Sequence, residues 1–491
     1  MTSMNIISPS YVIGRNGYVA KLASFDSNKI REIMSCLYLN YTVKTMINGK
    51  KGIIKKQLPL FTIENGYIKI MRFKAFELVE QGILPRAPLC CIARGDDVGA
   101  FNTLSLYPYQ QCIVDYLFTH IYTPQKIDEG SAGVILELEA GLGKTYVAGA
   151  VIARYKKKTL VIVPNVYLMN QNYKVFAQIG RVGRYYGREK HDGDIVIMIV
   201  NSVLSDSFIF AGAQITPAEY FKKFDMVILD EVNEYCSAER SKIYTRIQAR
   251  CMLGITAEAN ARDDNLDKLT HYNVGPVLCA ENIPNFDVPL TDKYNSVVHI
   301  VKYKGANEYT RVSYNSAGCV NTAELIDLLL QDPNRMDLII TYAKWLWNKG
   351  HNFFIWCDRR EGVKLIAQEL RNIPDMCGIK EENVAPAILM GGATDEDVQN
   401  AETARIIVAT YQYAYRGVSL PKFDAMIFAT PRRAKIYQTL KRIYRMSGDT
   451  SITRHIVDIV DVNTCLRAQL AERMQQYKNP IFGMKIENIK Q

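Results

Sequence analysis

One glycine-rich segment of the chain has the residue types and the order needed to bind a triphosphate. An apolar run at 133–138 precedes it, and a stretch with the composition of a helix, 146–154, follows it. The segment reads Glu139-Ala140-Gly141-Leu142-Gly143-Lys144-Thr145. Small residues let successive backbone N–H groups turn inward on phosphate oxygens, and the next helix points its positive N-terminal end at the same anion. The order strand, loop and helix therefore predicts a site for a nucleoside triphosphate.

The residues of this loop have distinct predicted roles. We expect the backbone of Gly141, Leu142 and Gly143 to surround the phosphates, and Lys144 to reach the β- and γ-phosphates as a point charge. The Thr145 hydroxyl is predicted to ligate Mg²⁺. The usual spacing is G-x-x-x-x-G-K-[ST], and this chain departs from it because Leu138 stands where a Gly or Ala is expected.

Two adjacent acids, Asp230 and Glu231, follow another apolar run at 224–229. Ligands of open α/β sheets bind at the carboxyl ends of the strands, and a strand buried on both faces should otherwise be apolar throughout. We predict that Asp230 holds Mg²⁺ in its outer sphere and that Glu231 orients and polarises the attacking water. The plainer alternative is a solvated strand end that caps a helix.

Three further polar residues could contact the nucleotide. Gln110, in a tyrosine- and proline-containing segment before the first strand, could hydrogen-bond an adenine edge, although such a segment is commonly just packing. Arg442 and Arg445 are three residues apart, so both lie on one face of a predicted helix. An arginine placed against a γ-phosphate stabilises transition-state charge. The alternative is a basic helix face or a backbone-phosphate contact, because 430–447 contains several Lys and Arg and no acid.

Short apolar runs that alternate with amphipathic stretches predict two successive α/β units with parallel sheets. The first series of strands is predicted at 133–138, 159–163, 194–200, 224–229 and 252–255, and the second at 353–357, 387–390, 405–409, 425–429 and 455–460. The segment 275–307 contains several prolines and shows little helical periodicity, so we predict a linker there. Residues 1–100 have short strand-like pieces and Asn-Gly turn signals, which predict a small α+β domain.

Bulk composition limits the class of protein. With 491 residues, 48% of them hydrophobic, the chain can bury several cores, and a net charge of +10 with pI ≈ 8.9 favours a polyanionic partner such as nucleic acid. Eleven cysteines without a C-x-x-C pair argue against a zinc ribbon or a secreted disulfide framework. The first residues lack a leader pattern and no run approaches a membrane span, so we expect a soluble intracellular protein in a reducing compartment.

In their order these motifs resemble those of the superfamily 2 helicases and translocases, over roughly residues 101–465. The matching segments are Gln110 (glutamine motif), 141–145 (motif I), 161–164 with Gln171 (Ia), 194–204 (Ib), 230–233 (II), 254–258 (III), 262–268, 355–358 (IV), 409–410 with 417–421 (V) and 438–445 (VI). The resemblance implies two tandem RecA-like P-loop domains that bind ATP and Mg²⁺ between them, and it places Gly417 among the ATP contacts. The implied domains are 1–100 (accessory), 101–285 (ATP-binding) and 286–491 (second RecA-like domain with a C-terminal tail).

Within that superfamily the chain looks closest to helicases of large cytoplasmic DNA viruses, of the asfarvirus and iridovirus type and more distantly the poxvirus transcript-release helicase. This implies a viral protein of transcription that acts on DNA or RNA in the virion or the host cytoplasm, with viral RNA polymerase or transcription factors as partners and no membrane. Three departures from the family's motifs bear on the coupling of ATP hydrolysis to strand movement. Asn233 replaces the His of D-E-x-H, 256–258 reads Thr-Ala-Glu in place of Ser-Ala-Thr, and Lys441 replaces a Gly.

The predicted function is therefore a nucleic-acid-dependent ATPase that moves along, and separates, nucleic acid strands. Open alternatives are a translocase that remodels complexes without unwinding and a degenerate, non-hydrolysing helicase fold that serves as a virion scaffold. A simple P-loop kinase leaves the second α/β series unexplained, and a nuclease fusion lacks a carboxylate-rich site. The sequence leaves open DNA versus RNA, polarity, oligomeric state and the role of residues 1–100.

Overall fold

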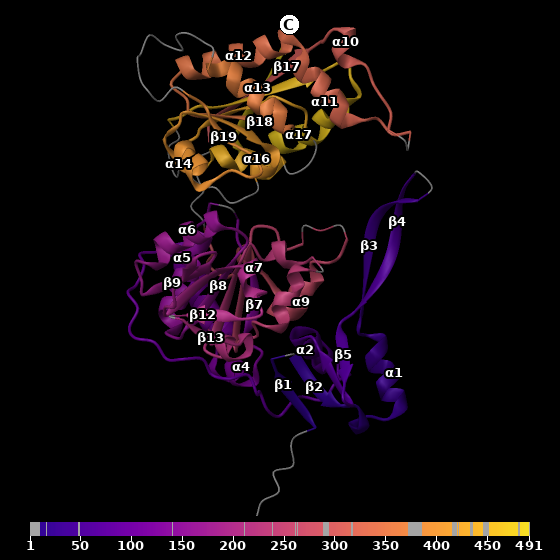
Figure 1. The fold of residues 1–491 in the computed structure, drawn as a ribbon, viewed down its shortest axis with the longest axis vertical. Coiled ribbons are helices and arrows are strands. Elements are labelled where there is room, and N and C mark those ends of the chain that lie inside the picture. Colours follow the sequence, from indigo (N-terminus) through magenta and orange to yellow (C-terminus); the bar gives the residue numbers. More distant parts are fainter. Residues whose placement is uncertain are drawn as a thin grey trace, which may run out of the picture. The chain divides into compact units, whose positions relative to one another are not determined.

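The computed structural model describes residues 10–490, apart from 16, 48–49, 140, 211, 238, 261, 263, 288–293, 316–317, 372–384, 415–419, 421, 433–435, 445–450 and 480–481. The chain forms two compact units (Figure 1). Unit 1 consists of Met1–Met46 and Lys51–Val288, and unit 2 of Ile47–Lys50 and Pro289–Gln491.

Unit 1 begins with a small α+β module that has its own core. Its antiparallel sheet has the order β1-β2-β6-β5. The elements are β1 (Tyr11–Gly14), β2 (Gly17–Lys21), α1 (Ser27–Ser35), β5 (Phe61–Glu64), β6 (Tyr67–Ile70) and α2 (Arg72–Glu80). Asn65 and Gly66 join β5 to β6 with φ of 51° and 78°, as the Asn-Gly turn signal predicts. The side chains that fill the core include Tyr18, Ile33, Leu37, Ile68, Ile70 and Leu78.

A two-stranded hairpin, β3 (Tyr38–Ile47) and β4 (Lys50–Pro59), extends from this module (Figure 1). At its base Leu39 packs with Leu60 and with Leu269 of α9 (Lys268–Val274). The Thr42 amide also donates to the Asp264 carbonyl at 3.3 Å. The hairpin is thus fixed at its base to the segment that follows the predicted motif III.

The first large sheet contains the phosphate loop and has the order β10-β9-β11-β8-β14-β15-β7-β16. Its strands are β7 (Gly133–Glu137), β8 (Thr159–Val163), β9 (Val182–Tyr186), β10 (Glu189–Lys190), β11 (Ile195–Ile199), β14 (Met226–Asp230), β15 (Cys251–Thr256) and β16 (Val277–Cys279). All neighbouring strands are parallel except β10, which pairs antiparallel with β9. The helices and short strands between them are α3 (Pro108–Tyr116), α4 (Pro124–Glu129), α5 (Lys144–Tyr155), α6 (Val166–Phe176), α7 (Val200–Val203), β12 (Phe208–Phe210), β13 (Ala213–Ile215) and α8 (Pro217–Phe221).

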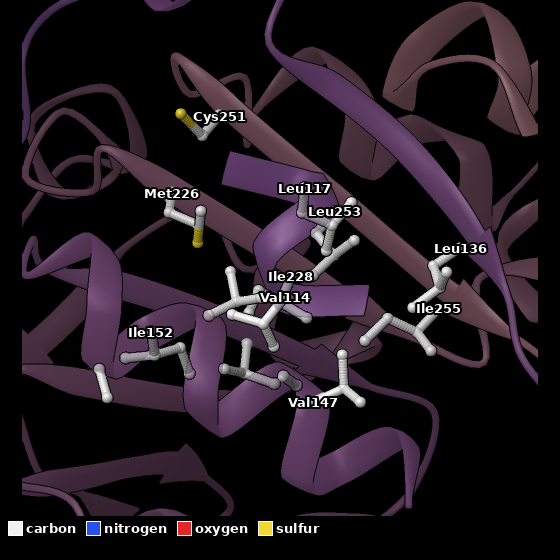
Figure 2. Close-up of a cluster of buried hydrophobic side chains, with 14 of the residues drawn as sticks. Val114, Leu117, Leu136, Val147, Ile152, Met226, Ile228, Cys251, Leu253 and Ile255 are labelled. Carbon is white, nitrogen blue, oxygen red and sulfur yellow. The ribbon is translucent and has the colours of Figure 1, made fainter. Parts of the chain in front are cut away.

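The central strands are apolar on both faces because each face packs on its own core. On β8, Val161 and Val163 face one core, whereas Leu160 and Ile162 face the other. Figure 2 shows the first core, in which side chains of β7, β14 and β15 meet those of α3 and α5. Labelled there are Val114, Leu117, Leu136, Val147, Ile152, Met226, Ile228, Cys251, Leu253 and Ile255.

The sheet of unit 2 is parallel throughout and has the order β19-β20-β18-β21-β22-β17-β23. Its strands are β17 (Ser296–Tyr303), β18 (Phe353–Cys357), β19 (Ala387–Leu389), β20 (Ile406–Thr410), β21 (Ala425–Phe428), β22 (Arg454–Asp461) and β23 (Met484–Lys490). The helices are α10 (Asn307–Thr310), α11 (Thr322–Gln331), α12 (Pro333–Asn348), α13 (Arg360–Arg371), α14 (Asp395–Thr403), α15 (Tyr411–Ala414), α16 (Ile436–Leu440) and α17 (Leu470–Tyr477). Side chains of α11, α12 and α13 pack on one face of the sheet.

The two large sheets have the same topology. Numbered by position along each unit, and leaving out the short β10, the strands lie in the order 3-4-2-5-6-1-7 in both sheets. The prediction of two tandem RecA-like α/β units is confirmed. The predicted linker at 275–307 is wrong in extent, because β16 is the edge strand of the first sheet and β17 lies between β22 and β23 in the second.

Candidate active site

The predicted phosphate loop lies between β7 and α5, as its sequence requires. Gly141 and Gly143 have φ of 93° and 79°, the left-handed region in which glycine is favoured. A Cβ on Gly141 would meet no atom within 4 Å, so the loop is open above this residue. A Cβ on Gly143 would lie 2.2 Å from Gln110 Nε2. Ala140 lies outside the described residues.

The charged residue of the loop pairs with a predicted catalytic acid. Lys144, the first residue of α5, donates from Nζ to Glu231 Oε1 at 2.8 Å, and both side chains are largely shielded from solvent. Glu231 follows β14 directly and has φ 49° and ψ 55°. Such left-handed backbone is strained for a residue with a side chain, and strain of this kind gathers at functional sites. The strained turn directs Glu231 toward the phosphate loop.

Asp230, the last residue of β14, is buried and held by two donors. Asn172 of α6 donates from Nδ2 to Asp230 Oδ2 at 3.0 Å, and the Glu231 amide donates to Oδ1 at 3.1 Å. Burial, together with the nearby Glu231 carboxylate, raises the pKa of Asp230 to about 6, although Lys144 and Asn172 oppose the rise. Sequence reasoning missed Asn172. The sequence feature that could have indicated Asn172 is its position one helical turn after Leu168, on the buried face of α6.

Gln110 contacts the phosphate loop itself. Its side chain is buried, its Nε2 donates to the Leu142 carbonyl at 3.0 Å, and its Oε1 accepts from the Tyr107 amide at 3.0 Å. Tyr107 stacks on Tyr109 with ring centroids 5.7 Å apart and is 61% exposed. Gln110 therefore supports the loop that is predicted to hold phosphate, and an exposed aromatic face stands beside it.

The predicted motif III also lies at this edge of the sheet. Thr256 ends β15, its carbonyl accepts from the Leu138 amide at 2.9 Å, and its hydroxyl accepts from the Glu258 amide at 3.1 Å. Glu137 Oε1 accepts from the Ala259 amide at 3.0 Å. By contrast, Asn233 Oδ1 is buried and has no hydrogen-bond partner among the described residues.

Glu137 is a second polar residue that sequence reasoning missed. It ends β7, and its Oε2 also accepts from Cys279 Sγ at 3.0 Å. This hydrogen bond and burial raise the pKa of Cys279 to about 11, so the thiol keeps its proton near neutral pH. In the sequence, Glu137 is an acidic residue at the end of an otherwise apolar strand. It falls within the predicted strand 133–138 and outside the phosphate-loop segment, which begins at Glu139.

The remaining predicted residues belong to unit 2. Arg442 lies in a 3₁₀ turn, Lys441–Ile443, that follows α16, and its side chain is buried. Arg445 and Gly417 lie outside the described residues. Lys144, Thr145, Asp230, Glu231 and Gln110 therefore share one edge of unit 1, whereas Arg442 belongs to a separate unit.

The distribution of metal-ligating side chains bears on the predicted Mg²⁺ site. Across the residues that the structure describes, no three or more His, Cys, Asp or Glu side chains gather as a metal-binding group. Mg²⁺ is usually held by one or two carboxylates together with waters and phosphates, so this finding is compatible with the predicted Mg²⁺ site.

None of the described helices is long and apolar enough to cross a membrane.

Comparisons with known proteins find similarities both for the first large domain and for most of the chain. Residues 103–260 match the family "Type III restriction enzyme, res subunit". The chain is 28% identical over 480 residues to "Putative ATP-dependent RNA helicase QP509L" of African swine fever virus, which covers 90% of this chain and 87% of that protein. It is 26% identical over 486 residues to "Putative ATP-dependent RNA helicase L396" of Acanthamoeba polyphaga mimivirus, which covers 96% and 86%.

A more distant relative is "Transcript termination protein A18" of Yaba-like disease virus, 20% identical over 417 residues that cover 78% of each chain. These findings confirm the resemblance to helicases of large DNA viruses. Residues 103–260 are thus similar to a restriction-enzyme family, and the chain has relatives named as putative ATP-dependent RNA helicases.

Proposed function

We propose that this chain is an ATP-dependent superfamily 2 helicase or translocase that acts on DNA, RNA or both. The observation that carries the proposal is the meeting of Lys144, Glu231 and Asp230 at the carboxyl edge of a parallel sheet, directly beside a phosphate loop. The family match and the names of the relatives support it. We assign residues 1–100 to an accessory domain, 101–285 to the ATP-binding domain and 286–491 to the second RecA-like domain with its C-terminal tail.

The residues of unit 1 fit ATP and Mg²⁺. A Cβ on Gly141 would meet no atom within 4 Å, so there is room for phosphate beside the backbone of Gly141, Leu142 and Gly143. Helix α5 begins directly after this loop, and its N-terminal end favours the same phosphates. Thr145 is the proposed direct ligand of Mg²⁺, and Asp230 holds it through water. When bound, Mg²⁺ neutralises charge on the phosphate oxygens.

Lys144 and Glu231 exchange partners when the nucleotide binds. Lys144 turns from the Glu231 carboxylate to the β- and γ-phosphates, and Glu231 then accepts a hydrogen bond from the attacking water and orients it. Gln110 fixes the Leu142 carbonyl and so keeps the loop in shape. The remaining N–H of its amide is the proposed donor to the adenine edge.

Unit 2 supplies the opposing charge in this proposal. Arg442 and Arg445 approach the γ-phosphate, and Gly417 contacts the nucleotide, as ATP draws the two units together. An arginine in that position is worth roughly 10³–10⁵ in rate. If the two units grip a strand differently in the open and closed states, each cycle becomes a step. One DNA base-pair step costs about 1.4 kcal/mol to open, so a small difference in grip suffices.

The finer biological assignment is a role in viral transcription, in transcript release or termination. The name of the poxvirus relative supports it, and a net charge of +10 suits a nucleic-acid partner. The proposed partners are therefore DNA or RNA and the viral RNA polymerase or its transcription factors. The proposed location is the virion and the cytoplasmic viral factory.

Steady-state ATP hydrolysis tests the function, measured with and without single- and double-stranded DNA and RNA. Lys144→Ala is the control for the phosphate loop, and Arg442→Ala tests the second unit. We expect wild-type turnover that nucleic acid stimulates, and its loss in both variants. Duplex-stimulated turnover without strand separation would identify a translocase. Wild-type turnover no greater than that of Lys144→Ala would reject the enzyme.

That last outcome would favour a non-hydrolysing helicase fold that serves as a virion scaffold. One observation motivates this second candidate: Asn233, three residues after Asp230, buries an Oδ1 without a partner in the described part of the chain. A site with a broken hydrogen-bond connection can keep its fold and lose its turnover. Stable binding of nucleic acid that ATP does not alter would be its signature.

A further inference from the structure

We infer that Glu137 is a positioning residue that couples nucleotide binding in the phosphate loop to the grip on nucleic acid. The inference rests on the proposed function and adds a residue that belongs to none of the motifs described above. Glu137 ends β7, two residues before Glu139 of the loop. Any movement of the loop on binding a triphosphate is therefore transmitted directly to the Glu137 backbone.

The carboxylate of Glu137 connects three strands at one edge of the sheet. In the strand register Glu137 lies between Thr256 of β15 and Cys279 of β16. Oε1 accepts from the Ala259 amide at 3.0 Å and Oε2 accepts from Cys279 Sγ at 3.0 Å. One side chain therefore holds both the loop after β15 and the end of β16.

Both connected segments lead away from the nucleotide. Beyond Ala259 the chain reaches Asp264, whose carboxylate pairs with Arg262 and whose carbonyl accepts from Thr42 of the hairpin. Beyond Cys279 the chain leaves unit 1 and enters unit 2 within about ten residues. Besides the backbone ladders, the Glu137 carboxylate thus joins the strand of the phosphate loop to the segment that leads to the hairpin base and to the segment that leads out of unit 1.

The neighbouring acid motif includes a side-chain oxygen that makes no such connection in the described part of the chain. Asn233 Oδ1 is buried and lacks a hydrogen-bond partner there, so this oxygen transmits nothing to the 256–259 loop. Thr256 is connected to the strand of the phosphate loop through its backbone: it lies opposite Glu137 in the parallel ladder, and its carbonyl accepts from the Leu138 amide. Glu137 therefore supplies a side-chain link between the strand of the phosphate loop and the residue that follows motif III.

The test measures coupling without requiring hydrolysis. Fluorescence anisotropy gives the Kd of a labelled single-stranded DNA, and of an RNA in parallel, with and without AMP-PNP and Mg²⁺. The ratio of the two Kd values is the coupling factor, which for linked sites is typically about 5- to 150-fold. We expect a factor in this range for the wild type and a factor near one for Glu137→Ala, with AMP-PNP affinity changed by less than about twofold.

Two variants separate coupling from a merely structural role. Glu137→Gln keeps an acceptor for the Ala259 amide, so it should restore most of the coupling factor. Glu281→Ala removes an exposed carboxylate from the 3₁₀ turn that follows Cys279 and should behave as wild type. A Glu137→Ala protein that melts like the wild type and keeps its coupling factor would overturn the inference, as would a wild-type factor near one. Failure of the proposed function is a separate result, seen as absent ATP turnover.

Discussion

Lys144 Nζ donates to Glu231 Oε1 at 2.8 Å, so the cation that should bind phosphate is held by the acid that should orient water. The pair is largely shielded from solvent and includes a residue in left-handed backbone, so it occupies a defined position. A nucleotide must displace Glu231 from Lys144 before either side chain takes its proposed role. The pair thus keeps both groups inactive until a triphosphate arrives.

Glu231→Gln should separate binding from hydrolysis. A neutral amide holds Lys144 more weakly, and even solvent-exposed ion pairs are worth about 0.2–1 kcal/mol, so ATP affinity should rise by about 1.5- to fivefold or more. Turnover should fall by roughly 10²–10³-fold because the amide cannot polarise the attacking water. Fluorescent-nucleotide titration and steady-state hydrolysis measure the two effects. A Gln variant that binds ATP less tightly than wild type would show that the ion pair does not compete with the nucleotide.

Asp230 predicts an acid limb in the pH profile. Its pKa of about 6 means that the carboxyl is ionised above pH 6 and neutral below, and the neutral form cannot hold Mg²⁺. At limiting Mg²⁺, hydrolysis should fall about tenfold per pH unit below 6. Excess Mg²⁺ favours the ionised form and should move the limb to lower pH. A profile that is flat from pH 5 to 7 at limiting Mg²⁺ would contradict the prediction.

The direction of the Asp230 pKa shift also distinguishes the predicted loss of activity at low pH from unfolding. Because the folded-state pKa of Asp230 is raised above the ordinary value near 4, protonation stabilises the folded chain. Its contribution to the free energy of unfolding is present below about pH 4 and is lost as the pH rises through about 6. Loss of activity on acidification should therefore precede any loss of structure, as circular dichroism on the same samples would show.

Gly143 should be more sensitive to substitution than Gly141. Both residues have left-handed φ, which costs about 1–3 kcal/mol for a residue with a side chain. Only at Gly143 does an added Cβ also meet Gln110, at 2.2 Å from Nε2. Gly143→Ala should therefore break the bond from Gln110 to the Leu142 carbonyl and weaken nucleotide binding further than Gly141→Ala does.

Thermal melting and nucleotide titration of the two variants and of Gln110→Ala test this comparison. The Gln110→Ala/Gly143→Ala double variant should lose the clash together with the Gln110 hydrogen bonds, so its melting temperature should approach that of Gln110→Ala/Gly141→Ala, which lacks the same bonds and adds only backbone strain. Equal effects of Gly141→Ala and Gly143→Ala would mean that Gln110 yields without cost.

Apolar, doubly buried strands are the part of the fold that sequence patterns predict best. The runs at 159–163 and 353–357 coincide with β8 and β18, because every side chain in them is buried. Strands near the sheet edges were missed, among them β9 and β23, because solvent on one side admits charged residues and conceals the pattern. The hairpin β3–β4 was missed for the same reason, since five consecutive exposed residues in β4, 53–57, read Ile-Ile-Lys-Lys-Gln.

The candidate site shows a similar division. Lys144, Asp230 and Glu231 follow from motif spacing, because adjacent carboxyl ends of parallel strands bring distant segments together. Asn172 and Glu137 have no motif, because their role depends on which backbone N–H or side chain the fold places opposite them. Contacts of this kind depend on tertiary structure and are not visible in local patterns.

The buried pair of Arg335 and Asp461 should contribute strongly to the stability of unit 2. Arg335 Nε and Nη2 donate to the Asp461 carboxylate at 2.8 and 3.0 Å, and neither side chain is exposed. Arg335→Met leaves a buried carboxylate without its partner and should lower the free energy of unfolding by about 3–5 kcal/mol. Urea titration followed by the fluorescence of the tryptophans, which all lie in unit 2, would measure the loss.

The matched control has the same bidentate geometry at the surface. Arg359 donates from Nε and Nη2 to Asp327 at 2.8 Å each, but the two side chains are 40% and 38% exposed. Water and salt screen this pair, so Arg359→Met should cost less than about 1 kcal/mol. The double variant Arg335→Met/Asp461→Leu removes both buried charges and should recover most of the stability that Arg335→Met loses. Similar losses for Arg335→Met and Arg359→Met would show that burial does not determine the contribution of these two pairs.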